Sequence, residues 1–597
     1  MSFPKIWSLC LLTKWVSEMP DFLDILNDLS LEQESACKAP QNVLLTACPG
    51  SGKTRTLTRR LAYQAIQKAP SKRWNIAITF TNRAAEEITT RLEDMGISPT
   101  NIWTGTIHQF CMRFIIRPYA MYSSRLSKGY TIIDEYTKNE YGRKLAEEFG
   151  IHLNYYDNPF LHSNVREAYE VLLEKNKEID FEMILRFSEE LLNCCPFICA
   201  NIANIINSIL VDEFQDTNEL QYSIIAKIYK ANKAISLMFV GDVNQAIYAS
   251  LGGVAKCRAE LEALYETEFK EMSLMGCYRS TQRVVNLYSN FEISKTGVNS
   301  VAEIKDVTGI ISYSKSIPKE RLIGEIVAII KSELEAGRKA EEICILAPQW
   351  YLLLKLSQEL RLQLPDVLFD APDISPIKYD PLNPLFLLAK LLFMPSGENV
   401  SVRKRIATEF ISIIRDDLKI AVPDCIQSYD ILFAVNGCRA IDDNGIVCLK
   451  AAIKRTFGLM KIDINQEKLL STMMDRFFAK IDSRINQYSL STDYNSISKY
   501  FKEKKGVVIS TIHGVKGEEY TTVIATSLLN GYLPHWDYIM KPEAKHLRKT
   551  ETLKLLYVLC SRAKQNIFLF SETGHRTNKG SAYTPTDELS LITDALF

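Results

Sequence analysis

The chain has 597 residues, of which 47% are hydrophobic and 24% are charged, as in ordinary soluble globular proteins of several domains. Lysine plus arginine and aspartate plus glutamate both number 71, so the net charge is zero and any polyanion must bind a local basic surface. The absence of a run of 18 apolar residues predicts no membrane span, and the apolar residues 6–12 are too short for an export signal. The 14 cysteines include no Cys-x-x-Cys pair, which favours a cytoplasmic location.

Apolar strand-like segments alternate with helical patterns along the chain, which predicts an α/β fold built on parallel sheets. The predicted strands are residues 43–47, 76–80, 207–212, 235–240, 343–347, 507–511, 521–526 and 566–570. Two helix-rich stretches, residues 116–200 and 376–495, have almost no strand signals. We interpret them as helical insertions into two α/β cores, the first over 1–115 and 201–290 and the second over 291–375 and 496–597.

A Gly-rich loop follows the first predicted strand, and a helix is predicted directly after it, from Thr54 to Gln67. The loop reads Ala47-Cys48-Pro49-Gly50-Ser51-Gly52-Lys53-Thr54. A strand, a tight turn and a helix N-terminus together form an anion site from backbone N–H groups. Lys53 is expected to reach the β- and γ-phosphates and Thr54 to ligate Mg²⁺, and the adjacent Arg55 is included in the nucleotide site. Ala47 stands where this pattern usually has a glycine, and a chance Gly-Lys-Thr before a helix is the alternative interpretation.

An acidic pair ends another predicted strand, at Asp212 and Glu213. The aspartate is suited to hold the coordination shell of a metal, and the glutamate is suited to orient and deprotonate water. Such a pair alone is more often a solvated surface feature, but a phosphate-binding loop upstream gives it significance. Together the two motifs predict hydrolysis of a nucleoside triphosphate, with ATP and Mg²⁺ as cofactors.

Six further motifs accompany the Gly-rich loop and the acidic pair along the chain. They are Ile78-Thr79-Phe80-Thr81-Asn82-Arg83, Trp103-Thr104-Gly105-Thr106-Ile107-His108, Phe239-Val240-Gly241-Asp242-Val243-Asn244-Gln245-Ala246-Ile247-Tyr248, Cys277-Tyr278-Arg279-Ser280, Thr511-Ile512-His513-Gly514-Val515-Lys516-Gly517-Glu518-Glu519 and Tyr557-Val558-Leu559-Cys560-Ser561-Arg562-Ala563. Their types and order resemble those of the UvrD/Rep/PcrA group of superfamily 1 DNA helicases over nearly the whole chain. The resemblance implies two RecA-like cores, each with a helical insertion.

The resemblance also implies roles for residues around the nucleotide. Gln33 would read the adenine edge, since an amide both donates and accepts, and Tyr278 would stack on the adenine ring. Gln245 would sense the γ-phosphate, and Glu519 would contact the ribose. Two arginines would touch the phosphates and stabilise the transition state, namely Arg279 and Arg562.

Single-stranded DNA contacts are implied in the same way, and phosphate donors and aromatic faces are the groups suited to them. The expected residues are Phe80, Thr81, Asn82, Trp103, Thr106, His108, Tyr248 and His513. Capped helix starts after core strands are the alternative for the Thr81 and Thr106 segments, and a buried aromatic is the alternative for Tyr248. After Tyr248 the chain departs from the family, because Ser250 and Leu251 stand where an aromatic and an arginine are usual.

We therefore expect a motor that hydrolyses Mg·ATP, moves on single-stranded DNA and unwinds forked DNA, with 3′→5′ polarity implied by the resemblance. The alternative is a nucleotide-gated subunit that senses DNA and regulates a partner nuclease, as in anti-phage systems of the Gabija type. About 35 residues follow Arg562, too few for an appended nuclease domain. A nuclease or a repair protein is thus the candidate partner, and no residue decides between the two functions.

Overall fold

The protein is described here by a computed structural model that places residues 25–592, except 68–70, 98–100, 154–156, 249–251, 372–382, 395–399, 489–490, 500, 502–505, 541–543 and 578. The apolar run at residues 6–12 and the divergent Ser250 and Leu251 lie outside the described residues. The chain forms two compact units. Unit 1 comprises Met1–Val285 and Glu292–Lys305, and unit 2 comprises Asn286–Phe291 and Asp306–Phe597. Over the described residues, the structure contains no helix with the length and apolarity needed to cross a membrane.

Unit 1 is built on a six-stranded parallel sheet with the strand order β3-β2-β6-β7-β1-β8. Its strands are β1 (Val43–Ala47), β2 (Trp74–Thr79), β3 (Ile102–Thr106), β6 (Ile206–Asp212), β7 (Ser236–Gly241) and β8 (Lys270–Leu274). Every residue of β6 is buried, as expected for a central parallel strand covered on both faces. Alternate residues of the strands enter two separate apolar clusters, for example Leu44 in one and Leu45 in the other.

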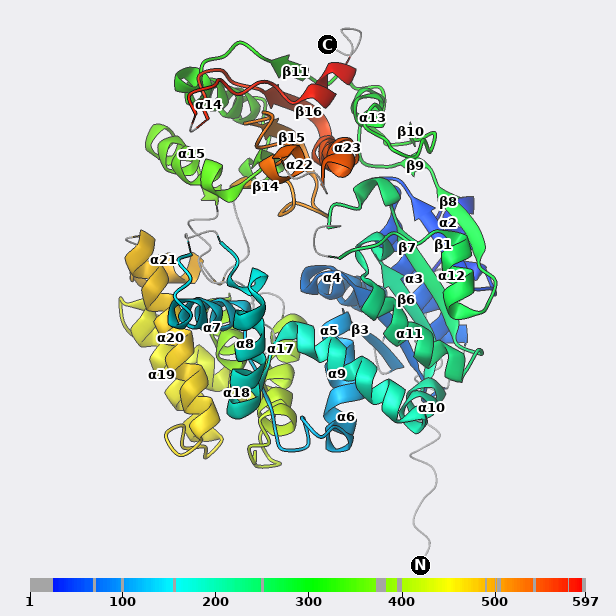
Figure 1. The fold of residues 1–597 in the computed structure, drawn as a ribbon, viewed down its shortest axis with the longest axis vertical. Coiled ribbons are helices and arrows are strands. Elements are labelled where there is room, and N and C mark those ends of the chain that lie inside the picture. Colours follow the sequence, from blue (N-terminus) through cyan, green and yellow to red (C-terminus); the bar gives the residue numbers. More distant parts are fainter. Residues whose placement is uncertain are drawn as a thin grey trace, which may run out of the picture. The chain divides into compact units, whose positions relative to one another are not determined.

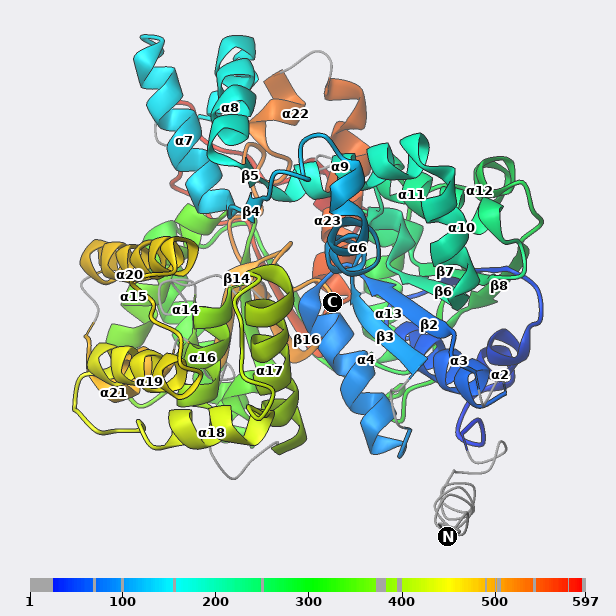
Figure 2. The ribbon, with the colours of Figure 1, turned by 90° about the horizontal axis from the view of Figure 1, so that it is seen from below.

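Helices cover both faces of this sheet. Figure 2 shows the strands between α3 (Lys53–Gln67) and α4 (Asn82–Asp94) on one side and α10 (Pro196–Asn204) and α11 (Glu219–Ala231) on the other. The first face packs on Leu57 and Leu61 of α3, and the second on Ile224 and Ile228 of α11. The sheet is thereby buried, and only its edges and the ends of its strands reach solvent.

The first predicted insertion consists mainly of helices. They are α6 (Arg117–Tyr119), α7 (Glu135–Glu148), α8 (Ser163–Asn176), α9 (Phe181–Cys194) and α10, with the short parallel pair β4 (Thr131–Ile132) and β5 (Glu178–Ile179) between them. Their apolar residues join the cluster on the α11 face of the sheet. This part of the chain therefore extends the core of unit 1 and supports the sheet that carries the motifs.

Unit 2 contains a second six-stranded parallel sheet, with the order β11-β16-β15-β12-β14-β13. Its strands are β11 (Ile311–Ser314), β12 (Ile343–Ala347), β13 (Phe369–Asp370), β14 (Val507–Thr511), β15 (Tyr520–Ala525) and β16 (Ala563–Phe570), flanked by α14 (Lys319–Glu335), α15 (Trp350–Gln363) and α23 (Arg548–Cys560). A helical group with its own core is inserted between β13 and β14 (Figure 1). It comprises α16 (Pro384–Phe393), α17 (Val400–Ser412), α18 (Ser428–Asn436), α19 (Gly445–Leu459), α20 (Lys468–Tyr488) and α21 (Tyr494–Lys499).

The predicted α/β class, with two parallel-sheet cores and helical stretches between their strands, is confirmed. All eight predicted strands are present, with ends shifted by no more than three residues. The strands that the sequence did not predict include β3, β8, β11 and β13, which are the outer strands of the two sheets.

Candidate nucleotide site and nucleic-acid surface

The Gly-rich loop joins β1 to α3 and is fixed by hydrogen bonds from its backbone and from the Ser51 hydroxyl. The Cys48 N–H donates to the Leu274 carbonyl at 3.0 Å, and the Ser51 hydroxyl donates to the Cys48 carbonyl at 2.8 Å. Gly50 and Gly52 have φ values of +71° and +80°, which other residues rarely adopt. A Cβ on Gly50 would lie 2.5 Å from the Arg279 Cβ, so this position requires glycine for packing as well. The loop therefore keeps the open backbone that an anion site needs.

Two predicted nucleotide residues lie directly against this loop. Gln33 is buried in the capping box of α2 (Leu31–Lys38), and its Nε2 donates to the Ser51 carbonyl at 2.9 Å. The Tyr278 N–H donates to the Gly50 carbonyl at 2.8 Å, and its ring is 49% exposed. The structure thus brings Gln33, Tyr278 and Arg279 together around the loop within unit 1.

The acidic pair lies at the end of β6. In the sheet, β7 lies between β6 and β1, the strand that leads into the Gly-rich loop. The pKa of Asp212 is raised to about 7, mainly by burial and also by the like charge of Glu213, and Lys53 opposes both effects. Burial likewise raises the pKa of Asp242, and Lys53 again opposes it. Two buried carboxylates that face one lysine form an oxygen-rich set suited to a hard divalent cation, and Thr54 at the start of α3 adds a hydroxyl.

A hydrogen-bonded chain of side chains connects the acidic pair with the loop after β7. Glu213 has a φ of +53°, and its carboxylate accepts from the Gln215 amide. The Gln215 Oε1 accepts from the Asp242 N–H at 3.1 Å, and the Gln245 Nε2 donates to the Asp242 carboxylate at 2.7 Å. A Cβ on Gly241 would meet the Gln215 Oε1 at 2.1 Å, so the close approach requires glycine. The side chains of Glu213 and Gln245 are therefore connected by hydrogen bonds through Gln215 and Asp242.

Sequence reasoning missed two members of this chain, Gln215 and Asp242. Gln215 is two residues after Glu213, and Asp242 is two residues after the end of the predicted strand 235–240, inside the motif that begins at Phe239. A carboxylate at the end of a second buried strand was the available signal for Asp242, because neighbouring parallel strands end at the same edge of a sheet. No sequence signal indicated that Gln215 would point into this network.

The other residues predicted around the nucleotide occupy several environments. Ala47, Cys48 and Pro49 are buried, and Lys53 is half-buried at the start of α3. Arg55 pairs with the Asp28 carboxylate and donates to the Asp28 carbonyl at 3.0 Å. The Arg55 side chain is therefore engaged with the segment before α2, and its place in a nucleotide site stays a prediction.

Two predicted nucleotide residues and one predicted DNA contact belong to unit 2. Arg562 is 1% exposed, and its guanidinium donates to the Val558 and Glu518 carbonyls at 3.1 and 3.2 Å. Glu519 forms an ion pair with Lys564 at 2.9 Å. His513 is half-buried in the turn after β14. Each of these residues follows or precedes a central strand of the second sheet.

The predicted DNA contacts of unit 1 gather where β2 and β3 end. Thr79 pairs with Thr106 across the two strands, so the residues that follow both strands share one edge of the sheet. Phe80 is 39% exposed and stacks on Tyr248, with ring centroids 4.7 Å apart and an interplanar angle of 29°. Burial raises the pKa of Tyr248 to about 12, so its hydroxyl stays neutral at physiological pH. Together the two rings form an aromatic step beside the nucleotide motifs.

Four other predicted DNA contacts lie at this edge, and two of them cap helices. Thr81 and Thr106 accept hydrogen bonds from the backbone as N-caps of α4 and α5 (Ile107–Phe110), which is the alternative that the sequence left open. The Asn82 Oδ1 is buried with no hydrogen-bond partner among the described residues. Burial lowers the pKa of His108 to about 4, so this ring is neutral and lies against Phe181.

The expectation that Trp103 offers a face to DNA bases disagrees with its position. The indole is only 9% exposed and packs against Phe110 and Phe114, with ring centroids 5.9 and 5.6 Å away. It points into the apolar cluster on the α11 face of the sheet because side chains alternate along β3. Trp103 is a core residue and is not part of the aromatic step.

Comparisons with known proteins agree with this arrangement. Residues 29–158 and 154–265 match the model of the UvrD/REP helicase N-terminal domain, and residues 460–573 match the model of the UvrD-like helicase C-terminal domain. The chain belongs to the UvrD/Rep/PcrA-like group of superfamily 1 helicases. The predicted family membership is thus confirmed, and the two matches include β1, β2, β3, β6 and β7 of the first sheet and β14, β15 and β16 of the second.

Individual members of the family show how far the likeness extends. An ATP-dependent DNA helicase PcrA of Staphylococcus epidermidis is 23% identical over 92% of this chain and 84% of its own length. A PcrA of Staphylococcus aureus is 29% identical over 44% of this chain and 39% of its own length. Family membership supports ATP and Mg²⁺ as the cofactors of this chain, in agreement with the Gly-rich loop and the buried carboxylates.

Proposed function

We propose that this protein is an ATP-dependent motor that moves along single-stranded DNA in the 3′→5′ direction and unwinds forked DNA. The observation that carries the proposal is the loop after β7. Its first residue, Asp242, belongs to the hydrogen-bonded chain that reaches Glu213, and Tyr248 of the same loop forms the aromatic step with Phe80. One short segment therefore connects a nucleotide site with a surface suited to bases.

The proposed mechanism assigns a task to each group of the nucleotide site. The Gly-rich loop and Lys53 bind the phosphates, and Asp212 with Thr54 holds Mg²⁺, which neutralises phosphate charge when it is bound. Glu213 accepts the proton of the attacking water, and Gln245 reports the state of the site through Asp242. Arg279 and Arg562 stabilise the transition state, Gln33 and Tyr278 hold the adenine, and Glu519 contacts the ribose.

Movement on DNA follows from the linkage between these groups. A change in the hydrogen bonds of Glu213 or Gln245 is transmitted to Asp242 and from there along six residues to Tyr248. Such a change shifts the aromatic step by altering the loop, since packed side chains switch between discrete arrangements. His513 is assigned to the DNA surface of unit 2 on the family resemblance.

A strand-displacement assay tests the proposal. Three substrates are compared, namely a fully paired duplex and duplexes with a single-stranded tail at the 3′ or the 5′ end. The proposal expects ATP-dependent separation of the 3′-tailed duplex above the other two, together with ATP hydrolysis stimulated by single-stranded DNA. Lys53→Ala is the matched control, because it removes a phosphate-binding charge and should abolish both signals.

The contrary outcomes are distinct. Preference for the 5′ tail would reverse the proposed polarity while leaving the motor in place. DNA-stimulated hydrolysis without any strand separation would favour the alternative function, a nucleotide-gated subunit that regulates a partner nuclease or repair protein. No hydrolysis in the folded parent would reject both.

A further inference from the structure

The loop after β7 contains a buried asparagine, Asn244, next to Gln245 of the hydrogen-bonded chain. Asn244 is 1% exposed, and its backbone N–H donates to one oxygen of the Asp242 carboxylate at 3.0 Å. The other oxygen of that carboxylate accepts from the Gln245 Nε2 at 2.7 Å. Asn244 is thus bonded through its main chain to the carboxylate that connects Gln245 with Glu213.

The side chain of Asn244 binds the backbone of a distant segment. Its Oδ1 accepts from the Ile293 and Ser294 N–H groups, both at 3.0 Å, and its Nδ2 donates to the Ser294 carbonyl at 3.0 Å. Ile293 is 43% exposed, and Ser294 is exposed as well. Water would therefore reach these backbone groups if the amide were absent, so the three hydrogen bonds fix a position rather than satisfy buried groups.

The segment held by Asn244 is the one in which the chain returns from unit 2 to unit 1. Residues Asn286–Phe291 belong to unit 2, and unit 1 resumes at Glu292. We call residues 292–300 the return segment. The buried amide therefore grips the chain directly after it has passed from one unit to the other.

Both sides of the return segment lead to residues that are assigned to the nucleotide. Before it, Tyr288 of α13 (Gln282–Ser289) lies against Tyr557 of α23, with ring centroids 5.2 Å apart, and α23 ends two residues before Arg562. At its end, β10 (Asn299–Ser300) pairs in parallel with β9 (Gly276–Cys277), which runs directly into Tyr278. A shift of the return segment would therefore act on elements that carry three different motifs.

Charge also connects the return segment with the loop after β7. The Glu292 carboxylate accepts from the Thr296 hydroxyl at 2.9 Å and from the Thr296 N–H at 3.3 Å. Burial raises the pKa of Glu292, the hydrogen bonds from Thr296 lower it, and the negative charge of Asp242 raises it. The first residue of the return segment thus lies within electrostatic reach of the carboxylate to which Asn244 is bonded.

We propose that Asn244 is a positioning residue for ATP hydrolysis, which couples the return segment to the carboxylate of Asp242. When nucleotide and Mg²⁺ occupy the site, the hydrogen bonds of Asp242 rearrange, and Asn244 passes the change to Ile293 and Ser294. Packed networks of this kind change between discrete arrangements. The inference rests on the proposed function and deepens it, because it names the residue through which the nucleotide state reaches the passage between the units.

Hydrogen–deuterium exchange of the full chain tests the coupling directly. Exchange is compared with and without Mg²⁺ and the non-hydrolysable analogue adenylyl imidodiphosphate. In the parent, exchange of the peptide that covers residues 292–296 should change by about threefold or more when the analogue binds. An asparagine that only tied down a loop would give no such response. Unchanged exchange at 292–296, with slowed exchange in the Gly-rich loop as proof of binding, would overturn the proposal.

Two substitutions of Asn244 separate its hydrogen bonds from its volume. Asn244→Leu keeps the size of the side chain but has neither donor nor acceptor. Exchange at 292–296 should become about tenfold faster, the size expected for lost hydrogen bonds, and should no longer respond to the analogue. Asn244→Asp retains an oxygen acceptor for both N–H groups and should restore most of the response. A leucine variant that responds like the parent would contradict the role of Asn244.

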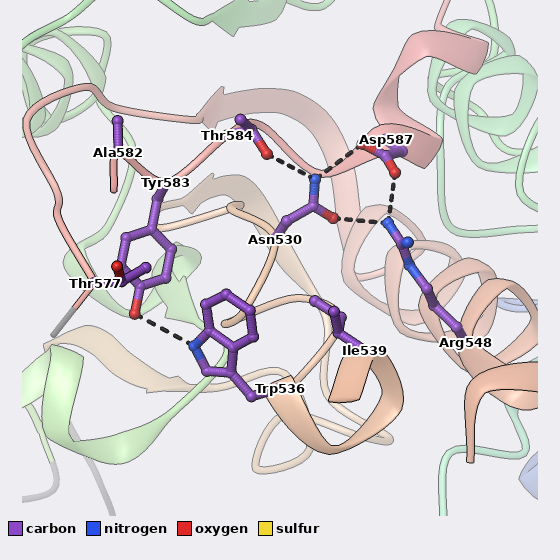
Figure 3. A pocket seen from close by; sticks show the side chains of 9 residues that line it. All are labelled: Asn530, Trp536, Ile539, Arg548, Thr577, Ala582, Tyr583, Thr584 and Asp587. Atoms are coloured by element: carbon purple, nitrogen blue, oxygen red, sulfur yellow. Dashed lines mark hydrogen bonds and ion pairs between the residues drawn. The ribbon is translucent and has the colours of Figure 1, made fainter. Parts of the chain in front are cut away.

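Asn530, which lines a cleft of unit 2, supplies the matched control, because its amide also ties two segments together (Figure 3). It donates to the Thr584 hydroxyl and the Pro585 carbonyl at 3.0 and 2.8 Å and accepts from Arg548 at 3.1 Å. Asn530→Leu should loosen its own surroundings and leave the nucleotide response at 292–296 as in the parent. An equal loss of that response would mean that any destabilising substitution abolishes it, and the assignment to Asn244 would fall.

Steady-state kinetics give an independent measure. Asn244→Leu should lower kcat for ATP hydrolysis about tenfold with KM for ATP within about twofold of the parent, and Asn244→Asp should recover most of kcat. Asn299→Ala removes only a hydrogen bond to the Gly297 carbonyl from the same segment and should change neither constant. If the leucine variant melts at a lower temperature but its folded molecules turn over like the parent, Asn244 is a structural residue only.

The outcomes also separate this inference from the motor proposal, because the exchange experiment needs nucleotide but no DNA. If exchange at 292–296 responds to the analogue but no strands separate in the displacement assay, the motor proposal fails and the coupling through Asn244 stands. If strands separate but exchange there does not respond, only the coupling fails.

Discussion

The two sheets have the same construction but handle buried charge in opposite ways. In unit 1, Asp212 and Asp242 are buried beside a single lysine, and burial raises the pKa of both. In unit 2, the buried Glu333 pairs with Arg338 and accepts from Thr522 and Asn566. Burial raises the pKa of Glu572 there, but hydrogen bonds from His575 and Ser527 outweigh it and hold the pKa below its usual value.

The contrast concerns the free energy of folding at the two sets of buried carboxylates. Pairing and hydrogen bonds offset part of the cost of burying a carboxylate, whereas a raised pKa means that ionisation of the buried carboxylate destabilises the fold. Asp212 and Asp242, at the ends of β6 and β7, are two such carboxylates of the first sheet. In the second sheet, the buried Arg562 guanidinium donates to the Val558 and Glu518 carbonyls.

The largest expected effect tests whether Arg562 acts as more than a structural residue. Arg562→Ala should slow DNA-stimulated ATP hydrolysis by about 10³–10⁵-fold, as removal of arginine fingers does, with a modest change in apparent ATP affinity. The guanidinium also donates to the Val558 and Glu518 carbonyls, so the melting temperature must be measured on the same variant. Parental turnover in a destabilised variant would show that Arg562 only holds unit 2 together.

Glu213→Gln should come next in size. The amide keeps the shape of the side chain but cannot accept a proton, so hydrolysis should fall by roughly 10²–10⁴-fold while ATP still binds. Single-turnover hydrolysis and equilibrium nucleotide binding check the two parts separately. Loss of binding would move Glu213 from water activation to metal binding.

Much of this organisation could be predicted from the sequence, and the misses share a physical cause. Central strands such as β6 are continuous apolar runs, and motif residues at their ends are therefore placed by the strand itself. Edge strands such as β8, which is largely exposed, have mixed sequences that resemble loops. The orientation of Trp103 and the Gln215 bridge depend on side-chain packing, which no local pattern specifies.

Trp103→Ala measures the consequence of one such miss. Because the indole is buried against Phe110 and Phe114, its removal should destabilise unit 1 by about 3–5 kcal/mol, the usual cost for a large core aromatic. Chemical denaturation measures the free energy of unfolding, and DNA binding is measured per folded molecule. A stable variant with weakened DNA binding would return Trp103 to the DNA surface.

Asp212→Asn tests the charge imbalance itself. The pKa of Asp212 is raised in the fold to about 7, so ionisation destabilises the folded protein as the pH rises from about 4 to about 7, and the cost persists above that range. The amide removes this cost, so the variant should be more stable than the parent at pH 8 by about 2–4 kcal/mol and similar to it near pH 4. Thermal unfolding across this pH range is the measurement. Added Mg²⁺ should stabilise the parent more than the variant, and equal stabilisation would place the cation elsewhere.

The smallest expected effect concerns Tyr248. Its ring belongs to the aromatic step and lies on the same loop as Asp242 of the nucleotide motifs. Tyr248→Ala removes half of the aromatic step but leaves the Gln215–Asp242–Gln245 hydrogen bonds in place. Single-stranded DNA binding should weaken by about 1–3 kcal/mol, the usual loss of one stacked base. DNA-stimulated hydrolysis should fall with it, while hydrolysis without DNA changes little.

Phe80→Ala is the matched variant, because it removes the exposed partner of the same ring pair. Both variants should lose affinity by similar amounts, and the parent's affinity should fall as salt rises because phosphate contacts release counterions. If Tyr248→Ala lowers the melting temperature steeply and leaves DNA affinity per folded molecule unchanged, its ring is a packing element. The proposed connection between the nucleotide site and DNA would then run through a segment other than the loop after β7. The raised pKa values of Asp212 and Asp242 would in that case bear on nucleotide binding and hydrolysis and not on DNA.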